Sequence, residues 1–321
     1  METPLVSVII PAYNHENYVQ DTIKSIINQT YENIELIVLD DGSKDFTWQK
    51  IEEMREECKQ RFVNVIFQTK KNEGTCKTLN TLVDLSKGDF IYIIASDDKA
   101  KSTAIEKEIT FLKNNNDFAL CVGDSEFIDS NGNICYWDAY RNVVYDKSLA
   151  SYITRKDSLS HKVDFLNDEF GTYETLYRGN YILNGYLIRK EIFNKIGYFT
   201  PDAPLEDYWL MLQISKYSKM KYLDEILFSY RWHNTNTIKD REKMHIYTMR
   251  TKLYEQNLLD ELYKNKKLPQ KITNIYKYGY FTKRRGIPYL FEIITNKKLV
   301  TKLKIIKLFN VTILKYEKRL K

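Results

Sequence analysis

Residues 7–43 read SVIIPAYNHENYVQDTIKSIINQTYENIELIVLDDGS, and the order of apolar residues in this stretch decides the fold class. Two continuous apolar runs, SVIIPAY (7–13) and IELIVL (34–39), have the length and composition of buried parallel strands. Between these runs, four apolar residues recur at helical spacing: Val19, Ile23, Ile26 and Ile27. A strand, a helix and a second strand in this order predict a βαβ unit.

The same alternation of strand and helix continues to about residue 125. VNVIF (63–67), FIYIIA (90–95) and FALCV (118–122) are strand-like runs separated by segments with helical spacing. Thr103 and Glu106 have the spacing of a capping box at the start of the last helix. The alternation predicts an α/β protein with a doubly wound, mostly parallel sheet, which is a Rossmann-like architecture.

The composition is that of an ordinary globular protein. The 321 residues are 43% hydrophobic and 29% charged, which excludes a disordered or collagenous chain. No stretch reaches the roughly 20 consecutive apolar residues that span a bilayer, and the start Met1–Pro4 does not resemble a signal peptide, so we expect a cytoplasmic protein. The four cysteines show no CxxC spacing, which favours reduced, buried thiols over a metal site.

Acidic residues follow the predicted strands at one edge of the sheet. Because ligands of open parallel sheets bind at the carboxyl ends of the strands, three segments are candidates: residues 11–14, 40–43 and 96–98. Neither glycine-rich phosphate-loop fingerprint, GxxxxGK[ST] or GxGxxG, occurs in the chain. The edge carries instead two pairs of aspartates, Asp40-Asp41 and Asp97-Asp98.

Two interpretations of these aspartates are open. Adjacent carboxylates about 4 Å apart repel by roughly 4 kcal/mol at an effective dielectric of 20. A bound Mg²⁺ or Mn²⁺ would remove that repulsion and bridge to phosphate oxygens, which predicts a metal–diphosphate site. Alternatively, each pair ends a strand and caps the following helix.

Five blocks of sequence resemble family 2 glycosyltransferases of the GT-A fold. The blocks are residues 6–45, the segment 72–98 that ends in SDD, 179–199, LEDYWLMLQIS (205–215) and YRWHNTNT (230–237). They stand in the family's order and cover most of residues 6–237. The resemblance implies a GT-A domain over residues 1–237, followed by a helical, basic C-terminal region over 238–321.

The resemblance also implies an activity. Such a protein would transfer a sugar, with inversion, from a nucleoside-diphosphate donor to a hydroxyl group of a glycan or lipid-linked acceptor. A UDP-sugar and a hexosyl or N-acetylhexosaminyl group are the expected donor, and bacterial surface polysaccharide is the expected product. Residues 1–125 would form the donor half and residues 126–237, rich in predicted loops, the acceptor half. The alternative is a nucleotide-sugar-binding module without catalysis.

Donor-binding residues follow from the same resemblance. Pro11 and Tyr13 would line the nucleotide base, and Asp40 would accept a hydrogen bond from it. Lys77 would offer a cation to the donor's phosphate or ribose, and Asp97 would contact ribose or metal. The alternatives are a core tyrosine at Tyr13 and a solvated lysine on a helix at Lys77.

Metal ligands are implied at Asp98, Asp97 and His233, with Mn²⁺ or Mg²⁺ as the ion. Asp98 would be the main ligand, and the late histidine His233 would reach the metal or the diphosphate. Ala95 occupies the first acidic position of the fuller D-x-D-D motif, so Asp97 and Asp98 would serve alone. A loop histidine without a functional role is the alternative for His233.

Catalysis is assigned to the acidic pair Glu206-Asp207. An inverting displacement needs one base to take the proton of the acceptor hydroxyl. The resemblance makes Asp207 that base and gives Glu206 an orienting role. The apolar spacing of LEDYWLMLQIS places both acids at the start of a helix. The alternative is that they only complement the helix dipole, which would lower their pKa values.

The C-terminal residues are strongly basic. Residues 282–321 contain twelve Lys/Arg and two acids, although the whole chain has a net charge of only +6. Leu299, Leu303 and Ile306 would share one face of a helix with lysines around it. Such a helix could lie on an anionic membrane on its cytoplasmic side, or pack on the catalytic domain. No nucleic-acid partner is expected, because the basic residues lack an accompanying binding-fold signal.

Overall fold

The parallel sheet predicted from the N-terminal residues is present in the structure, a computed structural model that describes residues 3–277, 306–308 and 311–314. Its first four strands pair in parallel in the order β3-β2-β1-β4. These strands are β1 (Val6–Ala12), β2 (Ile34–Asp40), β3 (Asn64–Thr69) and β4 (Phe90–Ile93). All seven residues of β2 are buried, as expected for a parallel strand covered on both faces.

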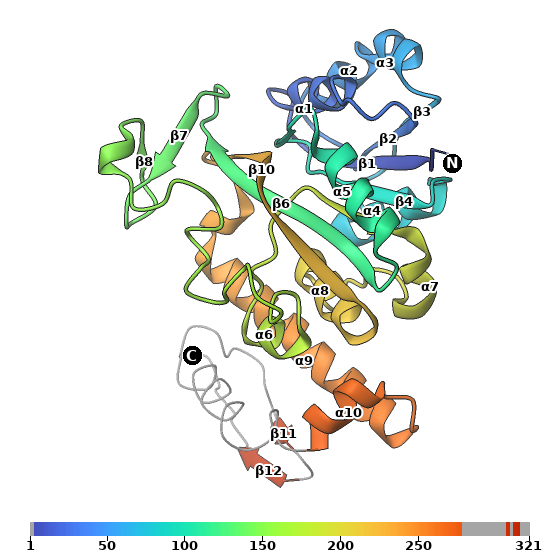
Figure 1. Cartoon of the computed structure of the whole chain (residues 1–321), viewed down its shortest axis with the longest axis vertical. Helices are drawn as coiled ribbons and strands as arrows, with labels where there is room; N and C mark the ends of the chain where they lie inside the picture. The colour runs from blue at the N-terminus through green and yellow to red at the C-terminus, as the bar shows by residue number, and fades with distance from the viewer. Residues whose placement is uncertain (1–2, 278–305, 309–310, 315–321) are drawn as a thin grey trace, which may run out of the picture. The chain divides into compact units, whose positions relative to one another are not determined.

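The sheet continues beyond β4 with strands of both directions. β9 (Tyr186–Arg189) is antiparallel to both β4 and β6 (Phe118–Ile128). β10 (Lys219–Arg231) runs parallel to β6, and the two long strands lie side by side in Figure 1. The short β5 (Lys99–Ala100) ends this path in antiparallel pairing with β10. The predicted strand at 118–122 is therefore confirmed but longer.

A two-stranded hairpin extends from the end of β6. It consists of β7 (Ile134–Trp137), which pairs with β6, and β8 (Val143–Val144), which pairs with β7 (Figure 1). Asp129 closes the turn before β7 by accepting hydrogen bonds from the backbone N–H groups of Asn131 and Asn133. Tightly hydrogen-bonded turns and short elements thus form much of the segment predicted as surface loops.

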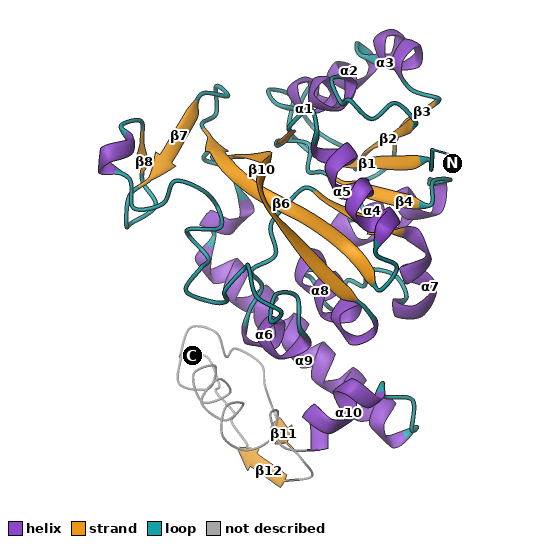
Figure 2. Cartoon of the chain, viewed as in Figure 1, coloured by secondary structure: helices purple, strands orange, loops and turns teal. Residues whose placement is uncertain are grey.

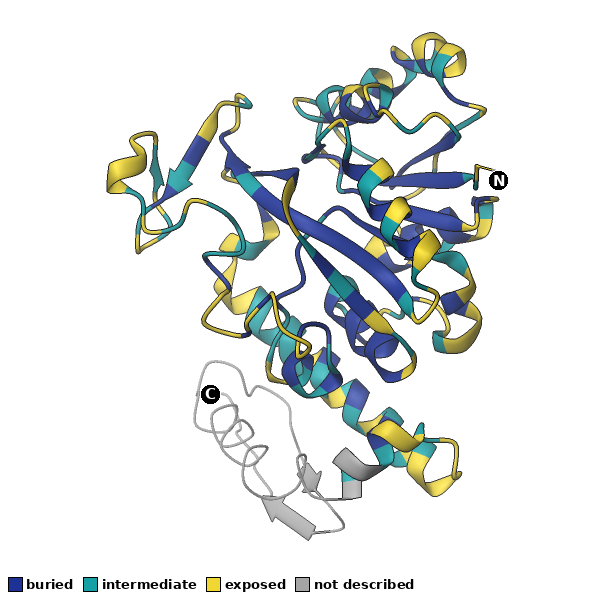
Figure 3. Ribbon diagram, in the orientation of Figure 1, coloured by how far each residue is buried: buried dark blue, intermediate teal, exposed yellow. Residues whose placement is uncertain are grey.

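Helices cover both faces of the N-terminal strands (Figure 2). One buried cluster joins Val6, Val8 and Ile10 of β1 to apolar residues of α1 (Val19–Ile27) and α5 (Ala104–Asn114). The other helices of this half are α2 (Thr47–Glu52), α3 (Arg55–Arg61) and α4 (Thr75–Leu85). Figure 3 shows the resulting pattern, with buried strands inside and exposed residues on the outer sides of the helices.

The predicted capping box at the start of α5 is not formed. Thr103 is the N-cap residue but makes no side-chain cap hydrogen bond. Glu106 instead accepts a hydrogen bond from the hydroxyl of Thr30. This hydrogen bond to a residue far away in the sequence takes the place of the local hydrogen bond that a capping box would form.

The part of the chain between the end of β6 and Lys266 contains four α-helices and three 3₁₀ turns. The helices are α6 (Tyr173–Arg178), α7 (Phe193–Ile196), α8 (Glu206–Tyr217) and α9 (Arg241–Lys264), and the turns are Lys147–Leu149, Lys190–Ile192 and Thr237–Lys239. The predicted helix start at Glu206 is confirmed. Lys216 of α8 and Glu255 of α9 form a fully buried ion pair of 2.7 Å. Gln213 and Tyr173 also donate hydrogen bonds to Glu255.

The chain divides into two compact units, Met1–Lys266 and Lys267–Lys321. The first unit extends past residue 237 and includes α9, because the Lys216–Glu255 pair ties α9 to α8. The second unit contains α10 (Gln270–Lys277) and an antiparallel pair, β11 (Ile306–Leu308) with β12 (Val311–Leu314).

The helical prediction for the C-terminal region is confirmed for α9 and α10 and wrong at 306–308 and 311–314. The two segments pair with each other as antiparallel strands there. The remainder of 282–321, including Leu299 and Leu303, lies outside the described residues. Every helix in the described ranges is too short or too polar to cross a membrane. All four cysteines are buried and unpaired, as predicted.

We expect Lys216→Met to lower the free energy of unfolding by about 3 to 5 kcal/mol, because it leaves the Glu255 carboxylate buried without its cation. Urea unfolding at pH 7 measures this change. Lys219→Met is the matched control, since Lys219 pairs with Asp117 at an exposed site and its loss should cost about 1 kcal/mol or less. Equal effects of the two substitutions would contradict the role given to the buried pair.

Candidate active site

The loops that follow β1 and β2 are bound to each other at the carboxyl edge of the sheet. Ala12 and Asp40 are register partners at the ends of the two strands. Beyond them, the backbone N–H of Asn14 donates to Ser43 Oγ (2.9 Å), and Asn14 Oδ1 accepts from the N–H of Lys44 (2.9 Å). Gly42 has φ +71°, and a Cβ there would lie 2.7 Å from the backbone nitrogen of Asn72.

The predicted base-binding residues lie on these two loops. Pro11 is partly buried near the end of β1, and the side chain of Tyr13 is 41% exposed, which excludes the alternative of a core tyrosine. Asp40 is buried and accepts hydrogen bonds from Ser43 and from the hydroxyl of Thr69 (2.8 Å).

Asp41 does not cap α2, the helix that follows its strand, but binds the segment that leads into α4. Its carboxylate accepts hydrogen bonds from the N–H groups of Glu73 (3.0 Å) and Gly74 (2.8 Å), directly before α4, and pairs with Lys70 (2.6 Å). Lys77 is exposed on α4, where its ammonium group lies 3.3 Å from a carboxylate oxygen of Glu73.

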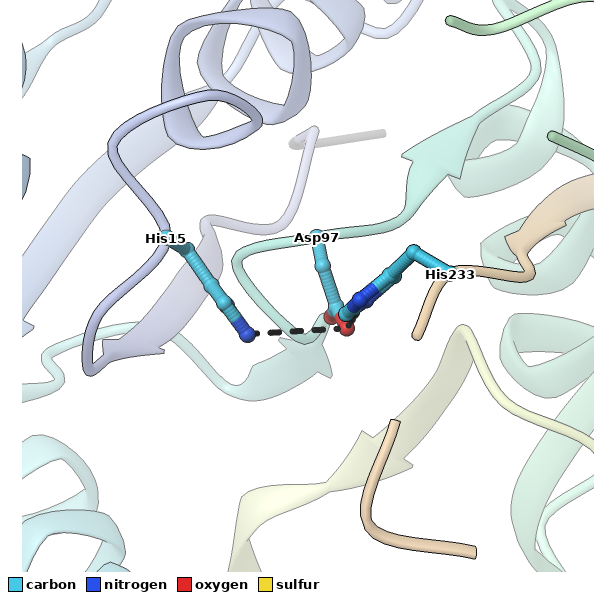
Figure 4. Close-up of side chains that lie close together, drawn as sticks. All are labelled: His15, Asp97 and His233. Atoms are coloured by element: carbon cyan, nitrogen blue, oxygen red, sulfur yellow. Dashed lines mark hydrogen bonds and ion pairs between the residues drawn. The ribbon is translucent and has the colours of Figure 1, made fainter. Parts of the chain in front are cut away.

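The second aspartate pair lies beside two histidines. Asp97 Oδ2 is 2.9 Å from His233 Nε2 and 3.8 Å from His15 Nε2 (Figure 4). One ligand atom from each of these three residues lies within 4.8 Å of the others. Ser96 Oγ is 2.8 Å from His15 Nδ1, and Thr235 Oγ1 is 2.8 Å from His233 Nδ1, so both rings are held in place. The structure therefore brings Asp97 and His233 together, as predicted.

Asp98 has a different environment. Its Oδ1 accepts a hydrogen bond from the backbone N–H of Arg231 (2.8 Å), and its Oδ2 accepts one from Asn184 (3.4 Å). The guanidinium of Arg231, only 1% exposed, donates to the carbonyl of Asp97 (2.7 Å) and pairs with Asp21 (3.0 Å). Asp98 thus connects the turn after β4 to the end of β10 and is not part of the three-residue cluster.

The two aspartates also differ in protonation. Burial by itself would raise the pKa of Asp97, but the hydrogen bond with His233 and the proximity of His15 outweigh burial and lower it. Burial, together with the charge of Asp97, raises the pKa of Asp98 well above its usual value. Burial lowers the pKa of His15, partly opposed by the Asp97 charge.

A cavity of about 630 Å³ joins this pair to the acidic start of α8. Asp97, Asp98, Glu206 and Asp207 all line it. Its other walls come from the start of α4, from Arg155 and from one face of α9. Within the described part of the chain, the lining does not include Pro11, Tyr13, Asp40, Lys77 or His233.

The carboxyl groups at the start of α8 retain protons more strongly than usual. Burial, with the charge of Asp207, raises the pKa of Glu206 to about 7. Burial also raises the pKa of Asp207, against hydrogen bonds from the N–H of Tyr208 (2.6 Å) and from Asn180 (2.9 Å). Burial thus acts against the lowered pKa values that a helix dipole alone would give.

Three residues of this site were missed in the sequence: His15, Arg231 and Asn180. His15 directly follows the strand-end segment 11–14, so its position at the sheet edge was an available signal. Arg231 lies within the quoted YRWHNTNT block but received no role. Asn180 lies in a loop, and no local pattern links it to Asp207.

The structure resembles solved glycosyltransferases. One is Staphylococcus aureus TarS 1–349 in complex with UDP-GlcNAc, with a TM-score of 0.52 and 19% identity over 77% of this chain and 66% of that chain. Another is the mannosyltransferase PcManGT from Pyrobaculum calidifontis in complex with GDP-Man and Mn²⁺, with a TM-score of 0.57 and 14% identity over 78% and 64%. This chain thus spans about two thirds of each solved chain. The fold is GT-A, a class of glycosyltransferase architecture.

Sequence comparison identifies the family. The family model for glycosyl transferase family 2 matches residues 7–199. An uncharacterized glycosyltransferase of Haemophilus influenzae is 32% identical over 73% of this chain and 67% of its own length. One from Methanocaldococcus jannaschii is 27% identical over 92% and 91%. This chain therefore belongs to glycosyl transferase family 2, as the motifs in the sequence predicted.

The raised pKa of Glu206 predicts a pH-dependent stability. The folded chain holds this proton up to about pH 7, whereas an unfolded glutamate loses it near 4.5, so the wild type loses stability as the pH rises between these values. Glu206→Gln should be more stable than the wild type at pH 8, by about 1 to 3 kcal/mol, and equally stable near pH 4.5. Denaturant unfolding at both pH values measures the difference, and an equal gain at both would contradict the assignment.

Proposed function

We propose that this chain transfers a sugar from a nucleoside-diphosphate donor to a hydroxyl group of a glycan or lipid-linked acceptor, with inversion at the anomeric carbon. The observation that carries the proposal is the single cavity lined by Asp97 and Asp98 at the strand ends and by Glu206 and Asp207 at the start of α8. A donor held at the strand ends would meet a carboxylate on the opposite wall. The similar structures with UDP-GlcNAc and with GDP-Man support a nucleotide-sugar donor.

Asp207 acts as the base in this proposal. Asn180 and the N–H of Tyr208 each hold one of its oxygens, so the carboxylate has a fixed orientation toward the cavity it lines. Its raised pKa makes it a stronger base than an ordinary aspartate. Glu206, protonated up to about pH 7, would donate a hydrogen bond to a substrate oxygen.

The cluster of His15, Asp97 and His233 fits a divalent metal ion. One carboxylate oxygen and two ring nitrogens converge within 4.8 Å. A mixed nitrogen and oxygen set favours Mn²⁺ over Mg²⁺, which prefers oxygen ligands alone. When bound, such an ion stabilises the negative charge of a departing diphosphate. Asp97 would be the main carboxylate ligand in place of Asp98, since Asp98 is held by Arg231 and Asn184.

The donor's nucleoside would lie at the neighbouring strand ends. Tyr13 offers an exposed ring there, and Asp40 offers a carboxylate adjacent in the sheet register to Ala12. Pro11 would contact the base, and Lys77 would reach the ribose or phosphate from α4. We propose UDP as the nucleotide of the donor and a bacterial surface polysaccharide as the product.

The partners outside the cavity are proposals as well. We place the chain in the cytoplasm, with the basic residues 282–321 directed to an anionic membrane. The second candidate function, donor binding without transfer, is disfavoured by the oriented Asp207.

Asp207→Asn should separate binding from chemistry. Asparagine keeps the shape and the bond to Tyr208 but cannot take a proton, so transfer should fall by about 10²- to 10⁴-fold. Donor affinity should stay within about twofold. Thermal stabilisation by a panel of UDP-, GDP- and dTDP-sugars with Mn²⁺ identifies the donor, and release of the free nucleoside diphosphate measures turnover. Normal turnover by the variant would show that another residue acts as the base.

The two aspartates after β4 should differ in metal binding. We expect Asp97→Asn to weaken Mn²⁺ binding at least about tenfold, because it removes the carboxylate nearest both histidines. Asp98→Asn is the matched control and should weaken it less, since an asparagine can still accept the hydrogen bond from Arg231. Electron paramagnetic resonance of free Mn²⁺ in a titration measures both. The reverse ranking would return the main ligand to Asp98, the assignment from the sequence.

A further inference from the structure

Arg155, Arg141 and Lys162 are neighbouring cations, and Arg155 lines the cavity that also holds Asp207. Arg141 lies in the turn between β7 and β8, and Arg155 and Lys162 lie in the loop that follows the hairpin. The guanidinium carbons of Arg141 and Arg155 lie 5.6 Å and 5.7 Å from the centroid of the same ring, Trp137. Arg155 also lies 5.1 Å from the ring of Tyr230. Both guanidinium groups therefore contact the same aromatic side chain.

The backbone fixes Arg155 in this position. Its N–H donates to the carbonyl of Ser125 in β6 (2.7 Å), and the preceding Thr154 forms a bridge with Glu126. The side chain is partly buried and lines the cavity together with Asp98 and Asp207. A cation held by the sheet and by two rings loses little conformational freedom when it binds an anion.

Lys162 is linked to the proposed base through one residue. Its ammonium group donates to the backbone carbonyl of Asn180 (2.7 Å), and the side chain of Asn180 donates to Asp207 (2.9 Å). An anion bound beside Lys162 and Arg155 would therefore lie near the carboxylate that accepts the acceptor's proton.

The charges of two cavity carboxylates, Asp98 and Asp207, act on Arg155, but neither of them contacts it directly in the described residues. In the ranges that the structure describes, neither Arg141, Arg155 nor Lys162 forms an ion pair. Lys156, next to Arg155 in the chain, differs, since it pairs with Asp224 at 2.6 Å. The three positive charges repel one another, and an oxyanion between them would remove that repulsion.

We propose that Arg155, with Arg141 and Lys162, binds a phosphate group of the acceptor, so that the acceptor of this enzyme is a phosphorylated glycan or lipid. The proposal rests on the proposed function, because it places the phosphate beside the base Asp207. A phosphate monoester carries nearly two negative charges, which matches three cations better than a single carboxylate does. The donor's diphosphate is expected elsewhere, at Asp97 and the two histidines.

The test uses the full-length protein and inorganic phosphate as the probe. Phosphate is titrated in the presence of EDTA, so that no divalent metal carries it, and binding is followed by ³¹P line broadening. We expect saturable binding by the wild type, weakened at least about tenfold in Arg155→Gln and in Lys162→Gln. Lys156→Gln, the matched control, should bind within twofold of the wild type. Absence of saturable binding by the wild type, or equal binding by all variants, would overturn the proposal.

A second arm separates the acceptor from the donor. The affinity of each variant for UDP, GDP and dTDP with Mn²⁺ is measured on the same preparations. Unchanged nucleotide affinity in Arg155→Gln supports an acceptor phosphate, whereas a parallel loss would assign the cations to the donor's diphosphate and overturn the proposal. If no nucleotide binds while phosphate still does, the proposed function fails and the anion site remains. Lys162 is exposed, so Lys162→Gln gives a result even if Arg155→Gln does not fold.

Discussion

One buried arginine holds the two halves of the active site together. Arg231, at the end of β10, donates from its guanidinium to the carbonyl of Asp97 and from its backbone N–H to the carboxylate of Asp98. The same guanidinium reaches Asp21 on α1. Burying a guanidinium is costly unless its donors are satisfied, so these bonds leave the arginine few alternative positions. These bonds therefore set the position of the loop that carries His233 relative to the strand ends of the N-terminal half.

That constraint explains why neighbouring carboxylates behave differently. The hydrogen bond with His233 and the proximity of His15 lower the pKa of Asp97 against the effect of burial, whereas burial and the charge of Asp97 raise the pKa of Asp98. Across the cavity, burial raises the pKa of both Glu206 and Asp207, and the charge of Asp207 adds to this rise at Glu206. When two neighbouring acids have different environments, their pKa values differ. One site can then hold both an ionised acid that binds a ligand and an acid that transfers a proton.

The fold of the N-terminal half could be predicted almost completely from the sequence, because the signals for its strands and helices are local. Apolar runs and helical spacing gave β1 to β4 and the helices between them, and the strand-end rule gave the positions of Asp40 and Asp97. The contacts that finish the site join residues far apart in the chain, such as His15 with Asp97 and Arg231 with Asp98, and no local pattern encodes them. Asp98 was assigned to metal from motif position, yet its partners in space give it a connecting role. At 306–308 and 311–314, the apolar spacing predicted a helix, but the two segments pair as antiparallel strands.

In the proposed function, the acceptor side and the donor side of the cavity differ in the kind of structure that forms them. The donor side is fixed by strand ends, where backbone geometry leaves little freedom. The acceptor side is made of loops from 126–180 and of α9, whose residues Lys243, Tyr247 and Arg250 line the cavity at helical spacing. Because α9 is locked to α8 by the buried Lys216–Glu255 pair, its cavity-facing residues keep a fixed distance from Asp207. In the proposed function, substitutions on α9 and in the loops would therefore change the acceptor, while the proposed base and metal ligands would stay in place.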